Sequence, residues 1–588
     1  MLKLIKDERV INPFKETSEH LIAIHTGEVM DPEISACLDS VHSIGEALAR
    51  TYIKEAIEDG TKPITDTISR TGLYTFTNRT PVKLGSTKSS SAKNTALVTQ
   101  MFMSLQARPE ADMLEFFSHE NQRDPPSLSE NGKIYQSAKS DLIDCLPGMV
   151  KPGKNPAARK AIVLLLDMPA IIHMVSPKKA STFVEYSPKH LVPFIDAQVR
   201  ETAVTIVHGV WDVYKEQRLK NQTGQFSKGS SQRRNVVGDS IPIPHGKDWT
   251  KSLNDPDTKN EMFPYLSKKI THIVAETPGR KKYSFTSTLN ESVICSDKDV
   301  NIESLQNCSH EEADTRIFIH LQFAARQGHH IAKIRTVDTD IVVLAIGLFF
   351  QLQLTELWVG FGTGKTYRDI PIHTVCQLLG PLKCEALPTF HALTGCDYTS
   401  FFRGKGKKTA WKAWEELPEM TEIFRAIEDS NPHEFTIDSP EMKALEKFVC
   451  YLYAKDKGYN NVNLCRQKMF TVGLKQLESI PPTLNALYQH VRRSLLICAF
   501  QWSFCLDNYP PSPDPNEWGW EWNPRTRSWV PYWTDLPDVS EGCSLLIHCG
   551  CKVSCRGNCK CFRANIRCTA LCECEGNCIN NDRFGDLD

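Results

Sequence analysis

The chain has 588 residues, of which 41% are hydrophobic and 24% are charged, and its formal net charge is -1. This length and composition predict several globular domains with sizeable cores. The sequence has no run of about 18 apolar residues that could cross a membrane, and its N-terminus lacks the features of a secretory signal. We therefore expect a soluble, intracellular protein without a membrane partner, in which binding to nucleic acid depends on local basic patches.

Residues 1–155 show mixed helical periodicity with polar breaks and no recognisable chemistry, and we treat them as an N-terminal extension of unknown role. In residues 156–425, continuous apolar runs alternate with helical patterns. That alternation is typical of an α/β domain with a mostly parallel sheet flanked by helices. The predicted strands span residues 161–167, 204–211, 331–337 and 356–361.

Carboxylates lie where these strands end. Asp167 ends the first predicted strand and Asp212 lies at the tip of the second. Open α/β sheets place their sites at the carboxyl ends of parallel strands. Asp338 and Asp340 interrupt an apolar run over residues 334–346. If that run is one strand, alternation puts both carboxylates on one face, whereas the alternative is that the strand ends near Thr339 and both acids are solvated loop residues.

A further acidic group opens a predicted helix with an inward apolar stripe and comprises Glu311, Glu312 and Asp314. Each acidic group alone has a structural explanation, because acids are common at strand ends and in first helical turns. Together they predict bound metal, since clustered carboxylates without a cation raise one another's pKa and destabilise the fold. Oxygen ligands favour Mg²⁺ or Mn²⁺, and two such ions about 3.5 to 4 Å apart promote phosphodiester hydrolysis.

A basic turn follows later in the chain. Gly-Cys-Asp-Tyr at 395–398 precedes Gly-Lys-Gly-Lys-Lys at 404–408 and a predicted helix. Glycines at this spacing let backbone N–H groups approach a phosphate, while lysines supply charge. Residues 160–415 here resemble the flap-endonuclease-like nucleases of the PIN-like superfamily. In that family, Gly-x-Asp-Tyr precedes a helix-three-turn-helix of the form Gly-x-Gly-x-Lys-x-Ala, which Gly404, Gly406, Lys408 and Ala410 match.

The resemblance implies that all seven acidic positions of the family are filled, by Asp167, Asp212, Glu312, Asp314, Asp338, Asp340 and Asp397. It implies Glu312 as the partner of Asp314, although Glu311 shares a face with Asp314 on an ideal helix. The implied DNA contacts in the turn are Gly404, Lys405, Gly406, Lys407 and Lys408.

The segment after Asp212 supplies further phosphate contacts in the family, and here it is less basic than usual. The contacts implied there are Lys220, Arg233 and Arg234, with Lys228 between them. We therefore expect a divalent-metal-dependent, structure-specific nuclease acting on DNA. The alternative is a catalytically weak or inactive nucleic-acid-binding protein, derived from a mobile element, that keeps the fold.

Two other motifs are rejected. GFGTGKT ends like a phosphate-binding loop, but Val359 stands where the first glycine is required. HEEAD begins like a zinc-protease helix, but Asp314 replaces the second histidine. The whole chain also resembles a widespread animal family that shares the HEEADTR, TVDTD and FHALTGCD motifs.

The remainder divides into three parts by composition. Residues 426–506 predict a helical extension. Residues 507–542 are rich in proline and tryptophan and predict a linker or a docking segment for a protein partner, with an ordered wrapper around a domain edge as the alternative. Residues 543–588 are rich in cysteine.

Nine of the 21 cysteines fall between residues 549 and 578: Cys549, Cys551, Cys555, Cys559, Cys561, Cys568, Cys572, Cys574 and Cys578. The odd count and the reducing compartment disfavour disulfides, and the density predicts Zn²⁺. Three tetrahedral ions need twelve ligand positions, which nine thiolates supply if three of them bridge. Two ions with one spare cysteine is the alternative.

This tail resembles the tesmin/TSO1-like CXC domain, including the CKCF sequence at 559–562. The resemblance implies DNA binding, helped by basic residues, and hence a nuclear protein; these residues are Lys552, Arg556, Lys560, Arg563 and Arg567. DNA-binding members usually carry two copies, and Asn558 replaces their tyrosine before Cys-x-Cys. A structural or protein-binding zinc knot is the alternative.

Overall fold

The protein was analysed as a computed structural model that describes residues 32–63, 112–121, 124–130, 132–148, 163–202, 204–214, 219, 237–276, 283–429, 434–455, 458–471, 477–524, 526–537, 548–552, 555–563, 567–568 and 572–582. The chain forms two compact units, residues 1–88 and 89–588. The described part of the first is helix α2 (Pro32–Ile53), continued by a π-helical turn over Lys54–Glu58. No helix in the described ranges has the length and apolarity needed to span a bilayer.

The second unit is built on a seven-stranded mixed sheet with the order β6-β5-β4-β3-β7-β8-β9. Its five central strands are parallel and its two edge strands are antiparallel. The strands are β3 (Val163–Asp167), β4 (Ile206–Val210), β5 (Ser284–Leu289), β6 (Ser292–Cys295), β7 (Ile331–Thr336), β8 (Glu356–Phe361) and β9 (Arg368–Pro371). The predicted α/β class with a mostly parallel sheet is therefore confirmed.

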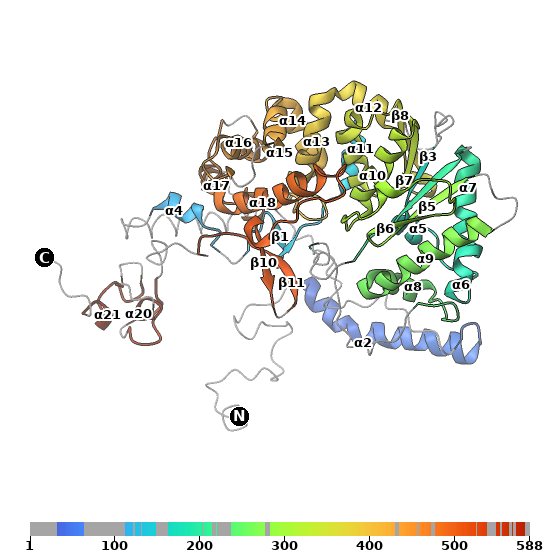
Figure 1. Cartoon of the computed structure of the whole chain (residues 1–588). Helices are drawn as coiled ribbons and strands as arrows, with labels where there is room; N and C mark the ends of the chain where they lie inside the picture. The colour runs from blue at the N-terminus through green and yellow to red at the C-terminus, as the bar shows by residue number, and fades with distance from the viewer. Residues whose placement is uncertain are drawn as a thin grey trace. The chain divides into compact units, whose positions relative to one another are not determined.

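Helices cover both faces of this sheet and continue beyond it (Figure 1). The described helices of the second unit are α4 (Met113–Ser118), α5 (Met168–Met174), α6 (Phe183–Tyr186), α7 (Val192–Thr202), α8 (Gly246–Asn254), α9 (Pro256–Glu276), α10 (Ala313–Arg326), α11 (Thr339–Leu348), α12 (Ile372–Leu379), α13 (Pro381–Leu393), α14 (Lys407–Glu416), α15 (Met420–Asp429), α16 (Pro440–Ala454), α17 (Val462–Thr471) and α18 (Leu484–Ile497), with α20 (Lys560–Arg563) and α21 (Ile579–Asp582) in the cysteine-rich tail.

Alternate residues of β3 face two different cores, as the twofold repeat of a strand requires. Leu164 and Leu166 belong to one hydrophobic cluster, which includes side chains of α5, α7 and α9. Val163 and Leu165 belong to the other, which includes side chains of α10, α11 and α13. Burial on both faces explains why these strands are continuous apolar runs in the sequence.

The second cluster extends far beyond the sheet. It takes in Leu128, Leu142 and Ile143 from the segment before β3, and buried side chains of α14 to α18. That early segment holds β1 (Ser129–Glu130), β2 (Lys133–Ile134) and the 3₁₀ helix η2 (Lys139–Cys145). Part of the predicted N-terminal extension is therefore integral to the main core.

The Pro/Trp-rich segment forms a hairpin, β10 (Trp520–Asn523) with β11 (Ser528–Pro531). Four of its tryptophans are buried in the same large cluster, namely Trp518, Trp520, Trp529 and Trp533. In the described residues it therefore behaves as the ordered wrapper that we gave as the alternative. These four side chains are not exposed for a partner.

Candidate acidic metal centre

Asp167 is the last residue of β3, and its carboxylate is tied down by two bonds. Its Oδ1 accepts from the Ala170 N–H at 3.2 Å and so caps α5, while its Oδ2 accepts from the Thr336 hydroxyl at 2.6 Å. The second bond links the carboxyl ends of the neighbouring strands β3 and β7. Burial raises the pKa of Asp167 to about 7.

Asp338 and Asp340 do not lie on a strand, so the interpretation in which the run over 334–346 is one strand is wrong. β7 ends at Thr336, and Asp338 is the N-cap of α11, with its Oδ1 accepting from the Asp340 N–H at 3.0 Å. The run that follows is buried on every side of the helix, so its periodicity resembles that of a buried strand. The two acids still come together, because an N-cap and the first turn of its helix are adjacent in space.

Asp314 lies in the first turn of α10, and Glu312 is the N-cap residue of that helix. Glu312 is therefore outside the regular helix, and the angular argument that favoured Glu311 does not apply to it. The Glu312 carboxylate accepts a hydrogen bond from the Tyr398 hydroxyl. Carboxylate oxygens of Asp314, Asp338 and Asp340 lie within 4.8 Å of one another, the spacing expected of shared metal ligands.

Asp212 stands just beyond β4 and supports this group from outside. Its Oδ1 accepts from the Ala313 N–H at 2.8 Å, at the start of α10, and its Oδ2 accepts from the Tyr214 hydroxyl at 2.8 Å. Among the described residues, the mutually close oxygens belong to Asp314, Asp338 and Asp340, and Asp212 lies outside that set. Its observed contacts hold the N-terminus of α10 in place.

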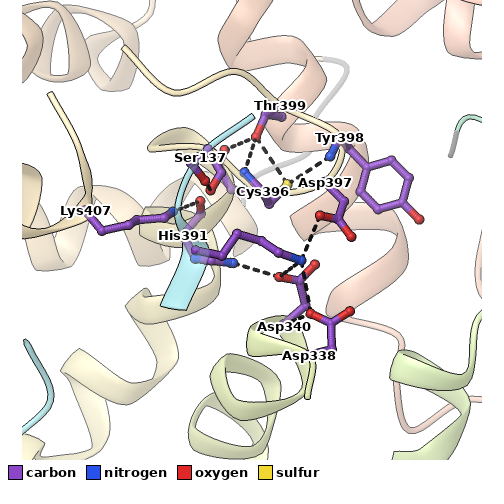
Figure 2. Close-up of polar contacts among 12 residues, drawn as sticks. Ser137, Asp338, Asp340, His391, Cys396, Asp397, Tyr398, Thr399 and Lys407 are labelled. Atoms are coloured by element: carbon purple, nitrogen blue, oxygen red, sulfur yellow. Dashed lines mark hydrogen bonds and ion pairs between the residues drawn. The ribbon is translucent and has the colours of Figure 1, made fainter. Parts of the chain in front are cut away.

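A lysine that the sequence analysis missed stands inside the acidic group. The Nζ of Lys139 lies 3.0 Å from Asp338 Oδ1, 3.1 Å from Asp340 Oδ1 and 2.8 Å from Asp397 Oδ1. Figure 2 shows these three carboxylates pointing toward one another. Burial alone would lower the pKa of Lys139, but the charges of Asp340, Asp338 and Asp397 outweigh burial and raise it above its ordinary value. The carboxylates are thus gathered around a cation.

Asp397 belongs to the loop between α13 and the basic turn. Gly395 in this loop has φ 108°, and a Cβ there would lie 2.8 Å from the Cβ of Phe401, so only glycine fits. The loop is closed by bonds of the Thr399 hydroxyl with the Cys396 N–H at 3.1 Å and with the Ala392 carbonyl. These bonds direct Asp397 toward Asp340 (Figure 2).

His391 is a second residue that the sequence analysis missed. It is fully buried in α13, and its Nε2 lies 2.9 Å from Asp340 Oδ1. Burial, together with the nearby Lys407 charge, lowers the pKa of His391 to about 4, so the ring is neutral and donates from Nε2. Its ring stacks on Trp502 with centroids 6.0 Å apart. His391 therefore positions the Asp340 carboxylate.

The basic turn differs in part from its predicted role. Lys407 is 1% exposed, and its Nζ donates to the His391 carbonyl at 2.7 Å and to the Thr394 hydroxyl at 2.9 Å. A phosphate cannot reach it there, so its assignment as a DNA contact is corrected. Lys408 is exposed but lies 3.2 Å from Asp144, and Lys405 lies over the Tyr453 ring at 5.1 Å.

The two glycines of the turn shape its backbone, and their predicted contact with DNA stays a prediction. Gly404 has a positive φ of 72°, and Gly406 is the N-cap of α14. Lys220, Lys228, Arg233 and Arg234 lie outside the described residues.

The cysteine-rich tail forms a cluster of its own. All nine predicted ligands are free thiols. Three overlapping groups of four lie close enough to share ions: Cys549, Cys555, Cys559 and Cys568; Cys549, Cys568, Cys572 and Cys574; and Cys555, Cys568, Cys574 and Cys578. Cys568 belongs to all three groups, and its Sγ accepts a hydrogen bond from the buried Asn580 amide at 3.4 Å.

The sulfur separations in this cluster fit zinc. Cys549 Sγ lies 3.7 Å from Cys555 Sγ and 3.8 Å from Cys568 Sγ. Zn–S bonds of about 2.3 Å at tetrahedral angles place sulfurs about 3.8 Å apart, whereas a disulfide needs about 2 Å. The three groups together contain seven of the nine cysteines, because Cys551 and Cys561 belong to none of them, so the number of ions stays a prediction.

No family model and no curated protein matches the chain. The solved structures similar to it include the T5 D15 protein co-crystallized with metal ions, at 11% identity and a TM-score of 0.27, covering 59% of this chain and 91% of that one. The catalytic core of Rad2 in complex with a DNA substrate is 11% identical with a TM-score of 0.28, covering 63% and 96%. Flap endonuclease-1 from Methanococcus jannaschii is 12% identical with a TM-score of 0.26, covering 54% and 93%.

Proposed function

We propose that this chain is a divalent-metal-dependent nuclease that hydrolyses phosphodiester bonds in DNA. The observation that carries the proposal is the convergence of Asp314, Asp338 and Asp340 to within 4.8 Å at the carboxyl edge of a mostly parallel sheet. Three carboxylates at this spacing are suited to a hard divalent cation.

The donor atoms of the acidic centre are of the kind that Mg²⁺ and Mn²⁺ prefer. The donors are carboxylate oxygens, and two of the three ligand residues already bind the Lys139 ammonium at 3.0 and 3.1 Å. Asp314, Asp338 and Asp340 would hold the ion, and Asp397 would support the same centre. The bound ion would supply an activated water and neutralise charge on the phosphate.

Two positioning groups act on the ligands themselves. His391 holds Asp340 through Nε2, and the α11 N-terminus fixes Asp338 through the Asp340 N–H. The Thr336 hydroxyl holds Asp167 at the same edge of the sheet. Such outer contacts fix ligand orientation, and their loss typically weakens metal binding about 10- to 100-fold. The exposed Gly404 turn and Lys405 are proposed to hold the DNA backbone.

The second candidate is a nucleic-acid-binding protein without turnover. The observation that favours it is Lys139, whose ammonium fills a position between three of the acids. The burial of Lys407 and the pairing of Lys408 with Asp144 also leave the turn with fewer cations for phosphate than the sequence predicts.

The two candidates are separated by incubating purified protein with labelled flap, hairpin and single-stranded DNA, and with matched RNA, in Mg²⁺ or Mn²⁺. Cleavage should be lost in Asp340→Asn by about a thousandfold or more, because a metal-bound transition state loses several kcal/mol of stabilisation. DNA binding should persist in the variant. Binding without cleavage by the wild-type protein in every substrate would establish the second candidate instead.

The tail is proposed to bind two or three zinc ions and to add DNA affinity. The thiolate clusters and their sulfur spacing support the zinc part of this proposal. The basic residues Arg556, Lys560 and Arg563 are exposed in the described tail and support the DNA part. Deleting residues 543–588 should leave cleavage intact and weaken DNA binding, as measured by fluorescence anisotropy.

A further inference from the structure

The contacts within the acidic centre divide into two overlapping sets of three carboxylates. One set is Asp314, Asp338 and Asp340, whose oxygens lie within 4.8 Å of one another. The other is Asp338, Asp340 and Asp397, each of which bonds the Lys139 Nζ. Two sets that share Asp338 and Asp340 are the arrangement a two-ion centre needs, because its ions lie about 3.5 to 4 Å apart and share ligands.

The second set is therefore already occupied by a cation of the chain itself, which neutralises part of its charge. The ammonium lies 2.8 to 3.1 Å from one oxygen of each carboxylate and carries one positive charge. Its side chain is only 18% exposed, and that of Asp340 is 0% exposed. A like-charged ion cannot enter the same position without first displacing the lysine.

The segment that carries Lys139 is packed into the hydrophobic core of the domain. Leu142 and Ile143, in the same 3₁₀ helix, are fully buried in the main hydrophobic cluster. Just before the lysine, the Ser137 hydroxyl donates to the Gly395 carbonyl at 3.0 Å, across 258 residues of chain (Figure 2).

Ion pairs on the outer side of η2 fix the segment further. Asp144 pairs with Arg368 at 3.2 Å and with Lys408 at 3.2 Å, so η2 is tied to both β9 and α14. Withdrawing Lys139 from the acids by moving the segment would expose the buried leucine and isoleucine to water, which is unfavourable. The backbone that carries the lysine is thus fixed beside the centre.

We propose that Lys139 is a resident cation of the acidic centre, so that the centre binds one divalent ion, at Asp314, Asp338 and Asp340, where a two-ion nuclease binds two. This inference rests on the proposed metal-dependent function. In a one-ion centre, the ammonium stabilises the negative charge of a bound phosphate in place of the second ion. Lys139 would thus act from a segment in which the sequence shows no recognisable chemistry.

The test counts Mn²⁺ ions by electron paramagnetic resonance in the full-length protein with its tail loaded with zinc. The number of ions at the centre is taken as the number that each protein loses when Asp340→Asn is introduced into it. The wild-type protein should lose one ion. Lys139→Met, which removes the charge and keeps much of the side-chain length, should bind two ions at the centre, and the first ion should bind on the order of tenfold more tightly or better because a like charge is gone.

Two further variants make the count interpretable. Lys139→Arg keeps a cation and should keep one ion. Lys251→Met removes a lysine that is 80% exposed on α8 and should leave the count at one. If Lys139→Met does not fold, the wild-type and Lys139→Arg counts still decide.

The outcomes separate this inference from the proposed function. One ion in the wild-type protein and two in Lys139→Met support the inference. Two ions in the wild-type protein, or one in Lys139→Met, overturn it and leave a metal-dependent nuclease standing. No ion at the centre of the wild-type protein overturns both.

Discussion

The acidic centre and the cysteine-rich tail both gather metal-ligating side chains, but the chain holds them together in opposite ways. The acids sit at the ends of β3 and β7 and at the starts of α10 and α11, elements that large hydrophobic clusters fix in place. The tail cluster consists of cysteines, with Phe562 packed against them. The acidic centre is thus held in place by a separate hydrophobic core. In the tail, the metal ligands themselves make up the core.

This difference determines what metal removal does to each region. At the acidic centre, Lys139 neutralises part of the carboxylate charge, so we expect the sheet domain to stay folded without an ion. In the tail, the described cluster consists almost entirely of cysteines, so we expect the binding free energy of the metal to become folding free energy.

Chelation is the strongest way to break this comparison. A strong zinc chelator should unfold residues 548–582 and leave the sheet domain folded, because structural zinc contributes on the order of 10 kcal/mol to such small domains. Limited proteolysis read by mass spectrometry measures both regions at once. Cys568→Ser should lose more zinc than Cys551→Ser, since Cys568 belongs to all three four-cysteine groups and Cys551 to none. A tail that resists protease in chelator would contradict the assignment.

The stability of the sheet domain, unlike that of the tail, should depend on pH through the buried Lys407. Burial lowers the pKa of Lys407 to about 7, against about 10.4 in an unfolded chain. Between these values the unfolded chain binds a proton that the folded chain does not, so stability rises with pH. Between pH 7 and pH 10, the free energy of unfolding of the wild-type protein should rise by about 2 to 4 kcal/mol relative to that of Lys407→Met.

Urea unfolding monitored on the sheet domain measures this difference. Lys251→Met, which removes an exposed lysine of α8, is the matched control and should track the wild-type protein at each pH. A difference between wild type and Lys407→Met that stays constant from pH 7 to pH 10 would show that Lys407 keeps its ordinary pKa.

His391→Asn tests whether the acidic centre depends on a support outside its ligands. The variant should bind Mn²⁺ about 10- to 100-fold more weakly, because the Asp340 carboxylate loses the donor that orients it. Isothermal titration with Mn²⁺ measures the loss, and circular dichroism checks the fold. His208→Asn is the matched control, since His208 is also buried but bonds His320. Equal losses in both variants would show a general effect on stability.

The smallest effect concerns the basic turn. Lys405→Ala with Lys408→Ala should weaken DNA binding about equally for all sequences and reduce the slope of log K against log salt by about 1. Lys405 should account for most of it, because Lys408 is already paired with Asp144. Anisotropy titrations across salt concentrations measure the slope, with Lys251→Ala as control. A slope that equals the wild-type value would remove the turn from the DNA-binding surface.

Much of the sheet could be predicted from the sequence, because strands buried on both faces are local apolar runs. Predicted residues 356–361 coincide with β8, and predicted residues 331–337 overlap β7. Strands β5, β6 and β9 were missed, since two of them are short edge strands and Thr286 to Thr288 of β5 read as polar. The error at Asp338 arose because a helix buried all round has no polar face to mark its period.

The residues that complete the acidic centre are a different matter. Lys139 lies in a polar stretch of no clear period, and its partners Asp338 and Asp397 come from parts of the chain that only the fold brings near. His391 lies in an apolar helix, where a buried histidine looks like any core residue. Local pattern carries no information about contacts of this range.

The anchoring of η2 has a practical consequence for fragments of this protein. A fragment that starts at Val163, the first residue of the large sheet, would keep every acid of the centre and so look like a minimal catalytic unit. It would nevertheless lack Lys139 and the buried pair Leu142 and Ile143. Such a fragment would expose an apolar hollow and carry an uncompensated group of acids. The shortest fragment that keeps the acidic centre intact therefore begins upstream of η2. A domain boundary placed at the first strand of the large sheet would remove this region.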